Sequence, residues 1–354
     1  NFINPITFET LTGNKCLVDT FDRNFQFSVE HVSLAKQADV VMIAPASANV
    51  IGKLAGGIAD DMLTTTVMAC RCPKIVAPAM NTNMFENPIV QDNLKKLERF
   101  GYEVVQPAVG LLACKDVGAG KLPEPEVLAD YITRSIAFEK DLAGKKILVT
   151  AGPTREPVDP VRYLTNHSTG KMGYALAKIC SLRGADVTLV TGKTSIAPPR
   201  FVKTVEITTA HEMYEAVTEA FPDQDIVIKA AAVADYRPAS VSSEKIKKTE
   251  GTAQIRLERT EDILASLGSK KRPGQFLCGF SMETENVLGN SRAKLAKKNL
   301  DMIVANNLKV PGAGFAGDTN VVTLITEKDE IALPLMSKEE TAVRILDKIL
   351  EMIS

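Results

Sequence analysis

The chain alternates short apolar runs with segments in which apolar residues recur at helical spacing. The apolar runs, which end at Gly, Pro or polar residues, cover residues 39–46, 74–79, 147–149, 184–192, 225–233 and 275–280. Segments with helical periodicity or a capping residue lie at 47–57, 127–136, 170–183 and 211–220. Buried strands that alternate with helices are typical of parallel sheets covered on both faces, so the pattern predicts an α/β fold.

A break in this rhythm predicts two domains. The amphipathic helix at 127–136 is followed by a polar stretch, and a new strand begins after residue 146. A chain of 354 residues is long enough for two hydrophobic cores. We therefore expect three-layer domains at 1–140 and 141–354. Because the chain starts at Asn1 rather than at Met, we expect the first domain to lack its N-terminal part.

Composition excludes several classes of function. The 42 basic and 43 acidic residues give a net charge of −1, so no general nucleic-acid or membrane surface is expected. The six cysteines are scattered except for Cys70 and Cys72, and with only three histidines a zinc site is not expected. Neither a signal peptide nor an apolar run of about eighteen residues appears, and a reducing, cytoplasmic location is expected.

The polar stretch 152–169 is the most informative part of the chain. It separates a strand from a helix that resumes near Met172, and loops of this length inside α/β domains are usually functional. Small residues and hydrogen-bond donors beside a helix N-terminus suit an anion, so we expect a phosphate-bearing ligand. Two common phosphate motifs are absent, because no Gly-x-Gly-x-x-Gly follows the strand and Met172 replaces the Ser or Thr of a P-loop.

Later residues of the second domain also suit a nucleotide. Three alanines at 230–232 allow close approach of a planar ligand, and Asp235 beyond that strand can accept from ribose hydroxyls or hold Mg²⁺. Lys294 and Lys298 lie four residues apart on a predicted helix and can converge on one polyphosphate. The basic cluster at 244–248 is equally well explained as a solvated charge run. Phe280 could stack on a base, although an isolated Phe at a strand end is more often a core residue.

One long motif carries a specific resemblance. The sequence Thr154-Arg-Glu-Pro-x-Asp-Pro-Val-Arg162, followed by Asn166-x-Ser-x-Gly-Lys-Met-Gly173, resembles the signature of phosphopantothenate-cysteine ligase, the second half of the bacterial bifunctional coenzyme A biosynthesis flavoprotein. The resemblance covers residues 145 to about 350. It implies a Rossmann-like domain that uses CTP to convert 4′-phosphopantothenate into an acyl-cytidylate, which cysteine then attacks.

The same resemblance implies roles for individual residues. Asn166 is expected to be catalytic, with its amide donating to the oxyanion that forms as cysteine attacks, and Arg162 and Lys171 are expected to bind substrate. Asp235 is expected to hold Mg²⁺, and Lys245 to reach CTP across a dimer interface. The positions expected to bind the nucleotide are Ala230, Ala231, Ala232, Asp235, Lys245, Thr260, Glu261, Asp262, Ile263, Phe280, Lys294 and Lys298. Thr260-Glu261 stands where the family usually has Asn-Pro.

Four motifs of the first domain resemble the phosphopantothenoylcysteine decarboxylase family, in the order found there. They lie at residues 30–36, 44–57, 78–84 and 112–120. The resemblance implies a flavodoxin-like fold with FMN, which oxidises the substrate thiol before CO₂ leaves. The residues expected to act here are Ser47 and Asn49 on FMN, Asn81 and Met84 on the substrate, His31 in the oxidation step and Cys114 as proton donor.

Other interpretations compete with this one. A lone His31 or Cys114 is more often structural than catalytic, and their joint occurrence with the Asn81 motif is what favours chemistry. Tyr174 and Lys178 fit the Tyr-x-x-x-Lys pair of NAD(P)-dependent short-chain dehydrogenases, but they follow the first strand of the domain rather than a late one. A non-catalytic flavoprotein-like binding subunit is the alternative from another class, and the presence of both His31 and Cys114 argues against it.

The sequence therefore predicts a bifunctional enzyme of coenzyme A biosynthesis. Its second domain is expected to be a CTP-dependent ligase and its first an FMN-dependent decarboxylase. Its partners are expected to be small molecules, with neither nucleic acid nor membrane. The chain is expected to form a homo-oligomer in which the ligase domains are dimers.

Overall fold

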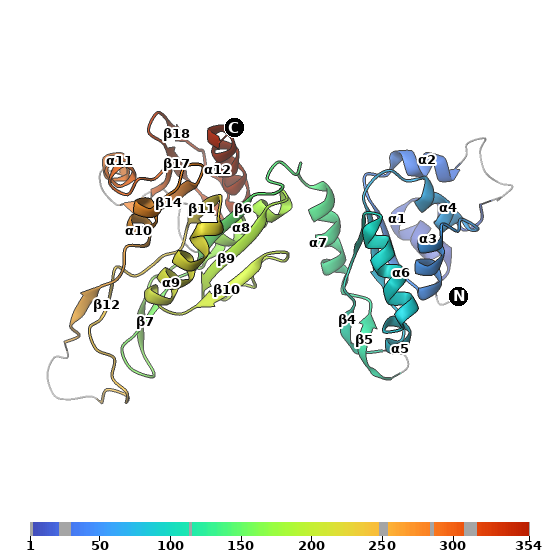
Figure 1. Cartoon of the computed structure of the whole chain (residues 1–354), viewed down its shortest axis with the longest axis horizontal. Coiled ribbons are helices and arrows are strands. Elements are labelled where there is room, and N and C mark those ends of the chain that lie inside the picture. The colour runs from blue at the N-terminus through green and yellow to red at the C-terminus, as the bar shows by residue number, and fades with distance from the viewer. Residues whose placement is uncertain are drawn as a thin grey trace. The chain divides into compact units, whose positions relative to one another are not determined.

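The computed structural model describes residues 3–20, 30–112, 115–247, 254–283, 287–307 and 317–353. The chain divides into two compact units, Asn1–Phe138 and Glu139–Ser354, and each has a sheet of its own (Figure 1). None of the helices in the described ranges combines the length and apolar character that a membrane crossing requires.

The first unit is built on parallel strands in the order β1-β2-β3. The strands are β1 (Val41–Ala46), β2 (Lys74–Pro78) and β3 (Tyr102–Val104), and β4 (Ala108–Leu111) and β5 (Val117–Lys121) form an antiparallel hairpin. The helices are α1 (Pro5–Thr12), α2 (Glu30–Gln37), α3 (Ala48–Gly56), α4 (Met62–Ala69), α5 (Thr82–Phe85), α6 (Pro88–Arg99) and α7 (Pro125–Ile136).

Side-chain alternation along β2 explains the layers of this unit. Ile75 and Ala77 join a core cluster that packs against Leu128 and Ile132 of α7, whereas Val76 joins the cluster formed with α3 and α6. Successive side chains of a strand point to opposite faces of the sheet. Helices therefore cover both faces, as the predicted three-layer α/β architecture requires.

The second unit contains a sheet whose order, within the described residues, is β10-β9-β6-β11-β14-β15-β17-β18. The strands are β6 (Lys146–Ala151), β9 (Asp186–Gly192), β10 (Lys203–Ile207), β11 (Ile226–Lys229), β14 (Phe276–Glu283), β15 (Met302–Asn307), β17 (Val322–Ile325) and β18 (Glu330–Ala332). All pairs from β10 to β15 are parallel, and β17 and β18 extend the sheet antiparallel. In order of appearance the parallel strands are arranged third, second, first, fourth, fifth, sixth, which is the Rossmann order.

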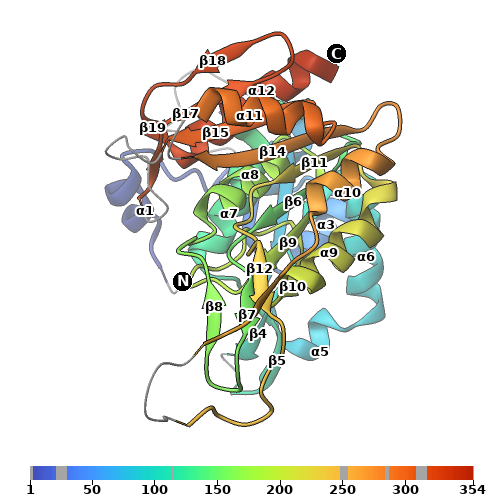
Figure 2. The same ribbon diagram turned by 90° about the vertical axis from the view of Figure 1, so that its left-hand side faces the viewer.

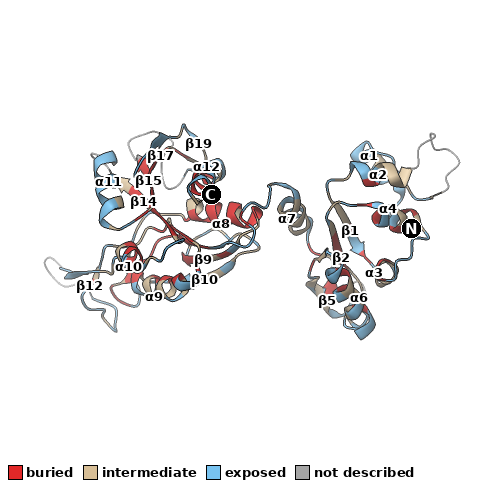
Figure 3. Cartoon of the chain, turned by 45° about the horizontal axis from the view of Figure 1, so that its top comes forward, coloured by how far each residue is buried: buried red, intermediate tan, exposed pale blue. Residues whose placement is uncertain are grey.

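Helices cover both faces of this sheet. They are α8 (Lys171–Leu182), α9 (Ala210–Ala220), α10 (Ile263–Lys270), α11 (Val287–Lys297) and α12 (Lys338–Ile353), with a 3₁₀ turn η1 (Phe221–Asp223) after α9. Helices α9, α10 and α11 share one core cluster with Leu148 and Val227. On the other face α8 packs on β6, β9 and α12. Figure 3 shows buried residues in the strands of this sheet and in α8, which packs on it.

Short hairpins supplement the sheet. They pair β7 (Arg155–Pro157) with β8 (Tyr163–Thr165), β12 (Tyr236–Pro238) with β13 (Leu257–Arg259), and β16 (Thr319–Asn320) with β19 (Met336–Ser337). Strands β7 and β12 lie side by side beyond the sheet (Figure 2). The stretch 152–169, expected to be one polar loop, therefore contains a hairpin. The strand expected at 225–233 ends at Lys229.

Candidate active site

The candidate site of the second unit lies at the carboxyl ends of β6 and β11, the neighbouring strands at which the strand order reverses. The segments that follow β6 and β11 remain hydrogen-bonded to each other beyond the strands. The Ala232 N–H donates to the Gly152 carbonyl at 3.0 Å, and the Thr154 N–H donates to the Ala232 carbonyl at 3.2 Å. The helices that follow these strands, α8 and α10, lie on opposite faces. Open α/β sheets bind ligands in the crevice formed at such a point.

Two glycines bring the N-terminus of α8 to this edge. Gly170 precedes the helix in a left-handed conformation with φ of 80°. A Cβ at Gly173 would lie 2.5 Å from the Ala151 Cβ and 2.9 Å from the Thr150 carbonyl oxygen, so the close approach of α8 to β6 requires glycine. The first N–H groups of a helix lack intrahelical partners and carry partial positive charge, so this end of α8 suits an anion.

A pocket of about 420 Å³, here called the central pocket, opens at this edge. Its walls come from the loop before α8, the start of α8, and the carboxyl ends of β11, β14 and β15. The predicted site residues that line it are Asn166, Lys171, Ala230, Ala231, Ala232, Asp235 and Phe280. The structure therefore brings together side chains from widely separated parts of the second unit.

Asn166 is anchored in the wall of the central pocket. Its Nδ2 donates to the Ala232 carbonyl at 3.0 Å, and the neighbouring Thr165 hydroxyl donates to the Thr154 carbonyl at 2.7 Å. An amide nitrogen carries two hydrogens, so one bond fixes the side chain and a second donor remains. This arrangement suits a side chain that donates to a ligand oxygen.

A second pocket of about 340 Å³, the lateral pocket, shares Lys229, Val233 and Asp235 with the central pocket. The predicted residues in its walls, besides Asp235, are Thr260, Glu261, Asp262, Ile263 and Lys298. Residues expected to bind one nucleotide are thus divided between two adjoining pockets.

Side chains fix the turn that lines the lateral pocket. The Thr260 hydroxyl donates to the Ala234 carbonyl at 2.6 Å. Asp262 caps α10 and forms an ion pair with Lys298 at 2.9 Å. Burial acts to raise the pKa of Asp262, but the hydrogen bond from Lys298 and the helix cap hold it below its ordinary value. Thr260 therefore secures the turn through its own hydroxyl.

Lys229, which the sequence did not single out, lies where the two pockets meet. Its side chain points to the face of the sheet that carries α10, because it follows Val227 by two residues. Within the described part of the chain its ammonium has neither a hydrogen bond nor an ion pair. Burial, and after it the charge of Lys298, lower the pKa of Lys229 to about 8. The available signal was a single lysine that ends an apolar run directly before three alanines.

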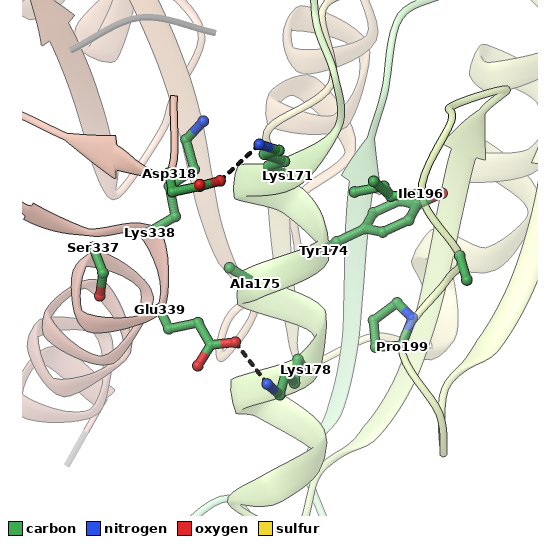
Figure 4. Close-up of a pocket in the computed structure, with 11 residues that line it drawn as sticks. Lys171, Tyr174, Ala175, Lys178, Ile196, Pro199, Asp318, Ser337, Lys338 and Glu339 are labelled. Atoms are coloured by element: carbon green, nitrogen blue, oxygen red, sulfur yellow. Dashed lines mark hydrogen bonds and ion pairs between the residues drawn. The ribbon is translucent and has the colours of Figure 1, made fainter. Parts of the chain in front are cut away.

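A third pocket of about 500 Å³, the outer pocket, lies between α8 and the start of α12 (Figure 4). Lys171, which also lines the central pocket, pairs here with Asp318 at 2.6 Å, and Lys178 pairs with Glu339 at 2.6 Å. The Tyr174 hydroxyl lies 3.1 Å from the Thr194 hydroxyl. Tyr174 and Lys178, which fit a dehydrogenase pair in the sequence, thus have other partners.

Of the second-unit residues expected to bind ligands, three line none of these three pockets, namely Arg162, Lys245 and Lys294. Arg162 forms an ion pair with Asp159 at 2.5 Å and donates to the Ile246 carbonyl at 2.7 Å. The Ile246 N–H donates to Asp159 at 3.1 Å. The guanidinium of Arg162 holds the pKa of Asp159 well below its usual range. This Asp159–Arg162 clamp fixes the backbone beside the exposed Lys245.

Carboxylates of the lateral pocket suit a magnesium ion bound with a nucleotide. The described residues contain no group of three or more His, Cys, Asp and Glu side chains placed to hold a metal. One oxygen of Glu261 lies 2.8 Å from His211 Nδ1, and the other is buried without a hydrogen-bond partner in the described structure. Mg²⁺ commonly binds one or two carboxylates together with phosphate oxygens and water. Asp235 and Glu261 fit that pattern.

In the first unit, the predicted flavin and substrate loops follow adjacent parallel strands. Ser47 caps α3 directly after β1, and Asn81 caps α5 after β2, each by accepting a backbone hydrogen bond. Asn49 and Met84 on these helices are exposed. Both loops lie at the carboxyl edge of the sheet, where flavodoxin-like folds bind their ligands. His31 is half-buried near the start of α2.

The β4–β5 hairpin packs directly on the Asn81 loop. The Met80 N–H donates to the Gly120 carbonyl at 3.0 Å. A Cβ at Gly120 would lie 2.2 Å from the Met80 carbonyl oxygen, and a Cβ at Gly118 would lie 2.4 Å from Thr82 Oγ1. Cys114, which lies between β4 and β5 in the sequence, is outside the described residues. The structure therefore places the β4–β5 hairpin beside the Asn81 loop.

Family models match both units. Residues 1–137 match the Flavoprotein family, and residues 142–353 match the DNA/pantothenate metabolism flavoprotein C-terminal domain. The chain is 46% identical over 352 residues to the coenzyme A biosynthesis bifunctional protein CoaBC of Bacillus subtilis (strain 168). This match covers 98% of this chain and 86% of that protein. It is 43% identical over 357 residues to a cysteine/cysteine sulfinic acid decarboxylase from an unknown prokaryotic organism. That match covers 99% of each of the two proteins.

A solved structure supports the fold of the second unit. The C-terminal domain of a coenzyme A biosynthesis bifunctional protein CoaBC is 45% identical in sequence and matches with a TM-score of 0.53. The match covers 61% of this chain and 98% of that domain. With a flavoprotein part, a pantothenate-metabolism part and high identity along almost its whole length, the chain belongs to the family of bifunctional coenzyme A biosynthesis proteins CoaBC.

Proposed function

We propose that the second unit joins 4′-phosphopantothenate to cysteine with CTP, and that the first unit decarboxylates the product with FMN. The observation that carries the ligase proposal is the pair of adjoining pockets, with Asn166 and the start of α8 in one and Lys298 in the other. An intermediate that contains both an acyl chain and a nucleotide requires a site in two parts. Membership of a family of bifunctional enzymes supports both activities.

In the first ligase half-reaction, the substrate carboxylate must be activated, because a carboxylate resists attack by an amine. Its oxygen attacks the α-phosphorus of CTP, pyrophosphate leaves, and an acyl-cytidylate forms. Phe280 stacks on the base, Asp235 accepts from the ribose, and Lys298 binds phosphate. Mg²⁺ held near Asp235 and Glu261 would offset negative charge on the nucleotide.

In the second half-reaction, the cysteine amine attacks the acyl carbon and CMP leaves. The second Nδ2 hydrogen of Asn166 donates to the oxygen that becomes negative, while the bond to Ala232 keeps the amide in place. Lys171, at the start of α8, binds the acyl substrate. Because these donors are fixed before the substrate binds, little reorganisation is needed in the transition state.

Lys245 is proposed to act on a second copy of the chain. Its side chain is exposed, and the Asp159–Arg162 clamp fixes the backbone next to it. A dimer of ligase units would bring it to the nucleotide of the partner. Lys245→Gln should then abolish pyrophosphate release while sedimentation still shows a dimer. Unchanged release would show that Lys245 is only a solvent-exposed side chain without a role in the reaction.

In the first unit, bound FMN supplies an electron acceptor for the substrate thiol. Ser47 and Asn49 lie at the carboxyl end of β1, where they can hold the cofactor, and Asn81 and Met84 lie at the next loop, where they can hold the substrate. His31 is proposed to assist oxidation of the thiol, after which carbon dioxide leaves from the cysteine carboxylate. Cys114 is then proposed to give a proton to the resulting enethiolate, and return of the two electrons from the cofactor yields the product thiol.

The test supplies substrates to the whole chain loaded with FMN. 4′-Phosphopantothenate and cysteine are offered with CTP, ATP, GTP or UTP in turn, and pyrophosphate and CO₂ are followed together. We expect CTP to give the fastest pyrophosphate release, followed by CO₂. If none of the four nucleotides yields pyrophosphate, the ligase proposal is wrong.

The identity to a cysteine/cysteine sulfinic acid decarboxylase favours a second candidate for the first unit. Free cysteine and phosphopantothenoylcysteine are therefore supplied separately without nucleotide. We expect CO₂ from phosphopantothenoylcysteine. Comparable CO₂ release from free cysteine would identify the second candidate instead.

A further inference from the structure

The central and lateral pockets meet at three shared residues, Lys229, Val233 and Asp235. This inference rests on the proposed ligase reaction, in which a carboxylate oxygen bonds to the α-phosphorus of a nucleotide. The proposed acyl-side residue Asn166 lies in the central pocket, and the phosphate-binding Lys298 lies in the lateral pocket. The phosphate that is attacked must therefore lie near the junction. Of the three shared side chains, all within the described ranges, Lys229 carries the one positive charge.

The surroundings of Lys229 leave its ammonium available to an anion. The charged groups that act on it are Lys294, Lys298, Asp235 and Asp262, and in the described structure none of them forms an ion pair with it. Lys298 differs, because Asp262 already neutralises it at 2.9 Å. Lys229 is partly buried, and partial burial of an ammonium group without a partner is unfavourable. A bound phosphate would remove that cost.

We propose that Lys229 is a further nucleotide-binding residue, which holds the phosphate attacked by the substrate carboxylate. Its ammonium donates to a nonbridging oxygen of that phosphate while the bond to pyrophosphate breaks. It remains protonated throughout and transfers no proton. A fixed positive charge at this point stabilises the negative charge on the phosphoryl oxygens in the transition state. Lys298 acts on the departing pyrophosphate.

The test compares two substitutions at one position with a matched control. Lys229→Met removes the charge with little change in volume, Lys229→Arg keeps the charge, and Lys178→Met removes a lysine that pairs with Glu339 in the outer pocket. Pyrophosphate release is measured over a range of CTP concentrations. We expect kcat/KM for CTP to fall about 10- to 100-fold in Lys229→Met, mainly in kcat, as for loss of one charged hydrogen bond. The KM for 4′-phosphopantothenate should change little, Lys229→Arg should retain more activity, and the control should match the wild type.

Thermal unfolding and calorimetry with CTP alone separate this role from a structural one. Replacing an unpartnered charge by an apolar side chain should leave the melting temperature of Lys229→Met equal or higher, while its affinity for CTP falls. Wild-type kcat/KM and CTP affinity in Lys229→Met would overturn the inference. Loss of stability together with activity, without recovery in Lys229→Arg, would overturn it as well. If the wild-type chain releases no pyrophosphate, the proposed ligase function is contradicted. The role of Lys229 is then still tested by the affinity of the wild type and of Lys229→Met for CTP.

Discussion

Two cations of the second unit, one at the amino edge of the sheet where the strands begin and one at the carboxyl edge where they end, differ in how they are paired. At the amino ends of the strands, Arg183 pairs with Asp141 at 2.5 Å and with Asp347 at 2.7 Å. Each of its three guanidinium nitrogens donates to a carboxylate, and its side chain is only 7% exposed. At the carboxyl ends, Lys229 lies among other charged groups and pairs with none of them in the described structure. The ion pairs of Arg183 stabilise the fold, whereas the ammonium of Lys229 can still bind a negatively charged ligand.

Other contacts continue this contrast at the amino edge. Asp225 accepts from the Lys146 N–H at 2.8 Å, and Asp301 accepts from the Leu277 N–H at 2.7 Å while it pairs with Lys271. Each of these carboxylates thus ties one strand to its neighbour. The difference between the edges gives predictions that separate loss of function from loss of stability.

The largest effect is expected from breaking the carboxyl edge at Asn166. In Asn166→Asp the oxyanion loses a donor, and the carboxylate also faces the Ala232 carbonyl, so amide formation should fall about 10²- to 10³-fold. Pyrophosphate release should persist, and acyl-cytidylate should accumulate in quenched samples. Thr165→Val removes only a structural hydrogen bond in the same loop and should ligate normally. Failure of Asn166→Asp to release pyrophosphate would show that its role was misassigned.

Breaking the amino edge should affect stability instead. Arg183→Met leaves Asp141 and Asp347 without their shared cation, and the free energy of unfolding of the second unit should fall by about 3 kcal/mol. Ligation measured well below the lowered melting temperature should be unchanged. Lys178→Met, on the same helix, breaks an exposed pair and should cost less than about 1 kcal/mol. Equal losses in the two variants would refute the contrast between the edges.

The substitution Gly173→Ala should have a smaller effect on both stability and ligation. The new Cβ would meet Ala151 at 2.5 Å, so α8 must move away from β6, at a cost of about 1 to 3 kcal/mol. Because this shift also moves the helix end that faces the central pocket, ligation should weaken. Gly52→Ala, in α3 of the first unit, is the matched control, since the nearest atom to its new Cβ is Asn93 Nδ2 of α6 at 3.9 Å. Denaturant unfolding and pyrophosphate release measure both consequences.

The smallest predicted effect is a rise of stability with pH in two separate ranges, one set by Asp141 and the other by Lys229. Hydrogen bonds from Arg183 hold the pKa of Asp141 below its ordinary value of 3.8, so this contribution to stability is present above about pH 4 and is lost as the pH falls. Burial lowers the pKa of Lys229 to about 8, whereas the unfolded chain holds this proton up to about pH 10.5, so the stability of the wild type should rise between these two values. The stability advantage of Lys229→Met over the wild type should therefore shrink between about pH 8 and pH 10. A constant difference across that range would contradict the assignment.

The sequence predicted the architecture well because the signals of this fold are local. Apolar runs such as Ile147–Val149 and Ile226–Ile228 are buried on both faces of a parallel sheet, so their composition alone marks them as strands. The capping side chain of Ser47 begins a helix at the position where the structure has it, whereas the helix that Asp262 caps was not predicted. The short strands β7, β8, β12 and β13 were missed, since each has three residues and depends on pairing with a distant segment.

The candidate site was only partly predictable, for a similar reason. The resemblance named Asn166, Asp235 and Phe280, and the structure places them around one pocket. It could not show that Arg162 is engaged by Asp159, because that clamp depends on the fold of the hairpins. Lys229 escaped notice because a lysine at a strand end is ordinary in sequence. Its unusual feature is the absence of a partner among the described groups, which only the folded chain reveals.

The division of the chain has a genetic consequence. The segment after Phe138 already belongs to the second unit, since Leu142 is fully buried and its N–H donates to the Arg183 carbonyl at 3.0 Å. A gene split directly after codon 138 would keep Asp141 and Leu142 with the core that they complete. A split after codon 145 would remove both, and the encoded fragment would lose the partner of Arg183. Two open reading frames that divide this enzyme should therefore meet at the earlier position.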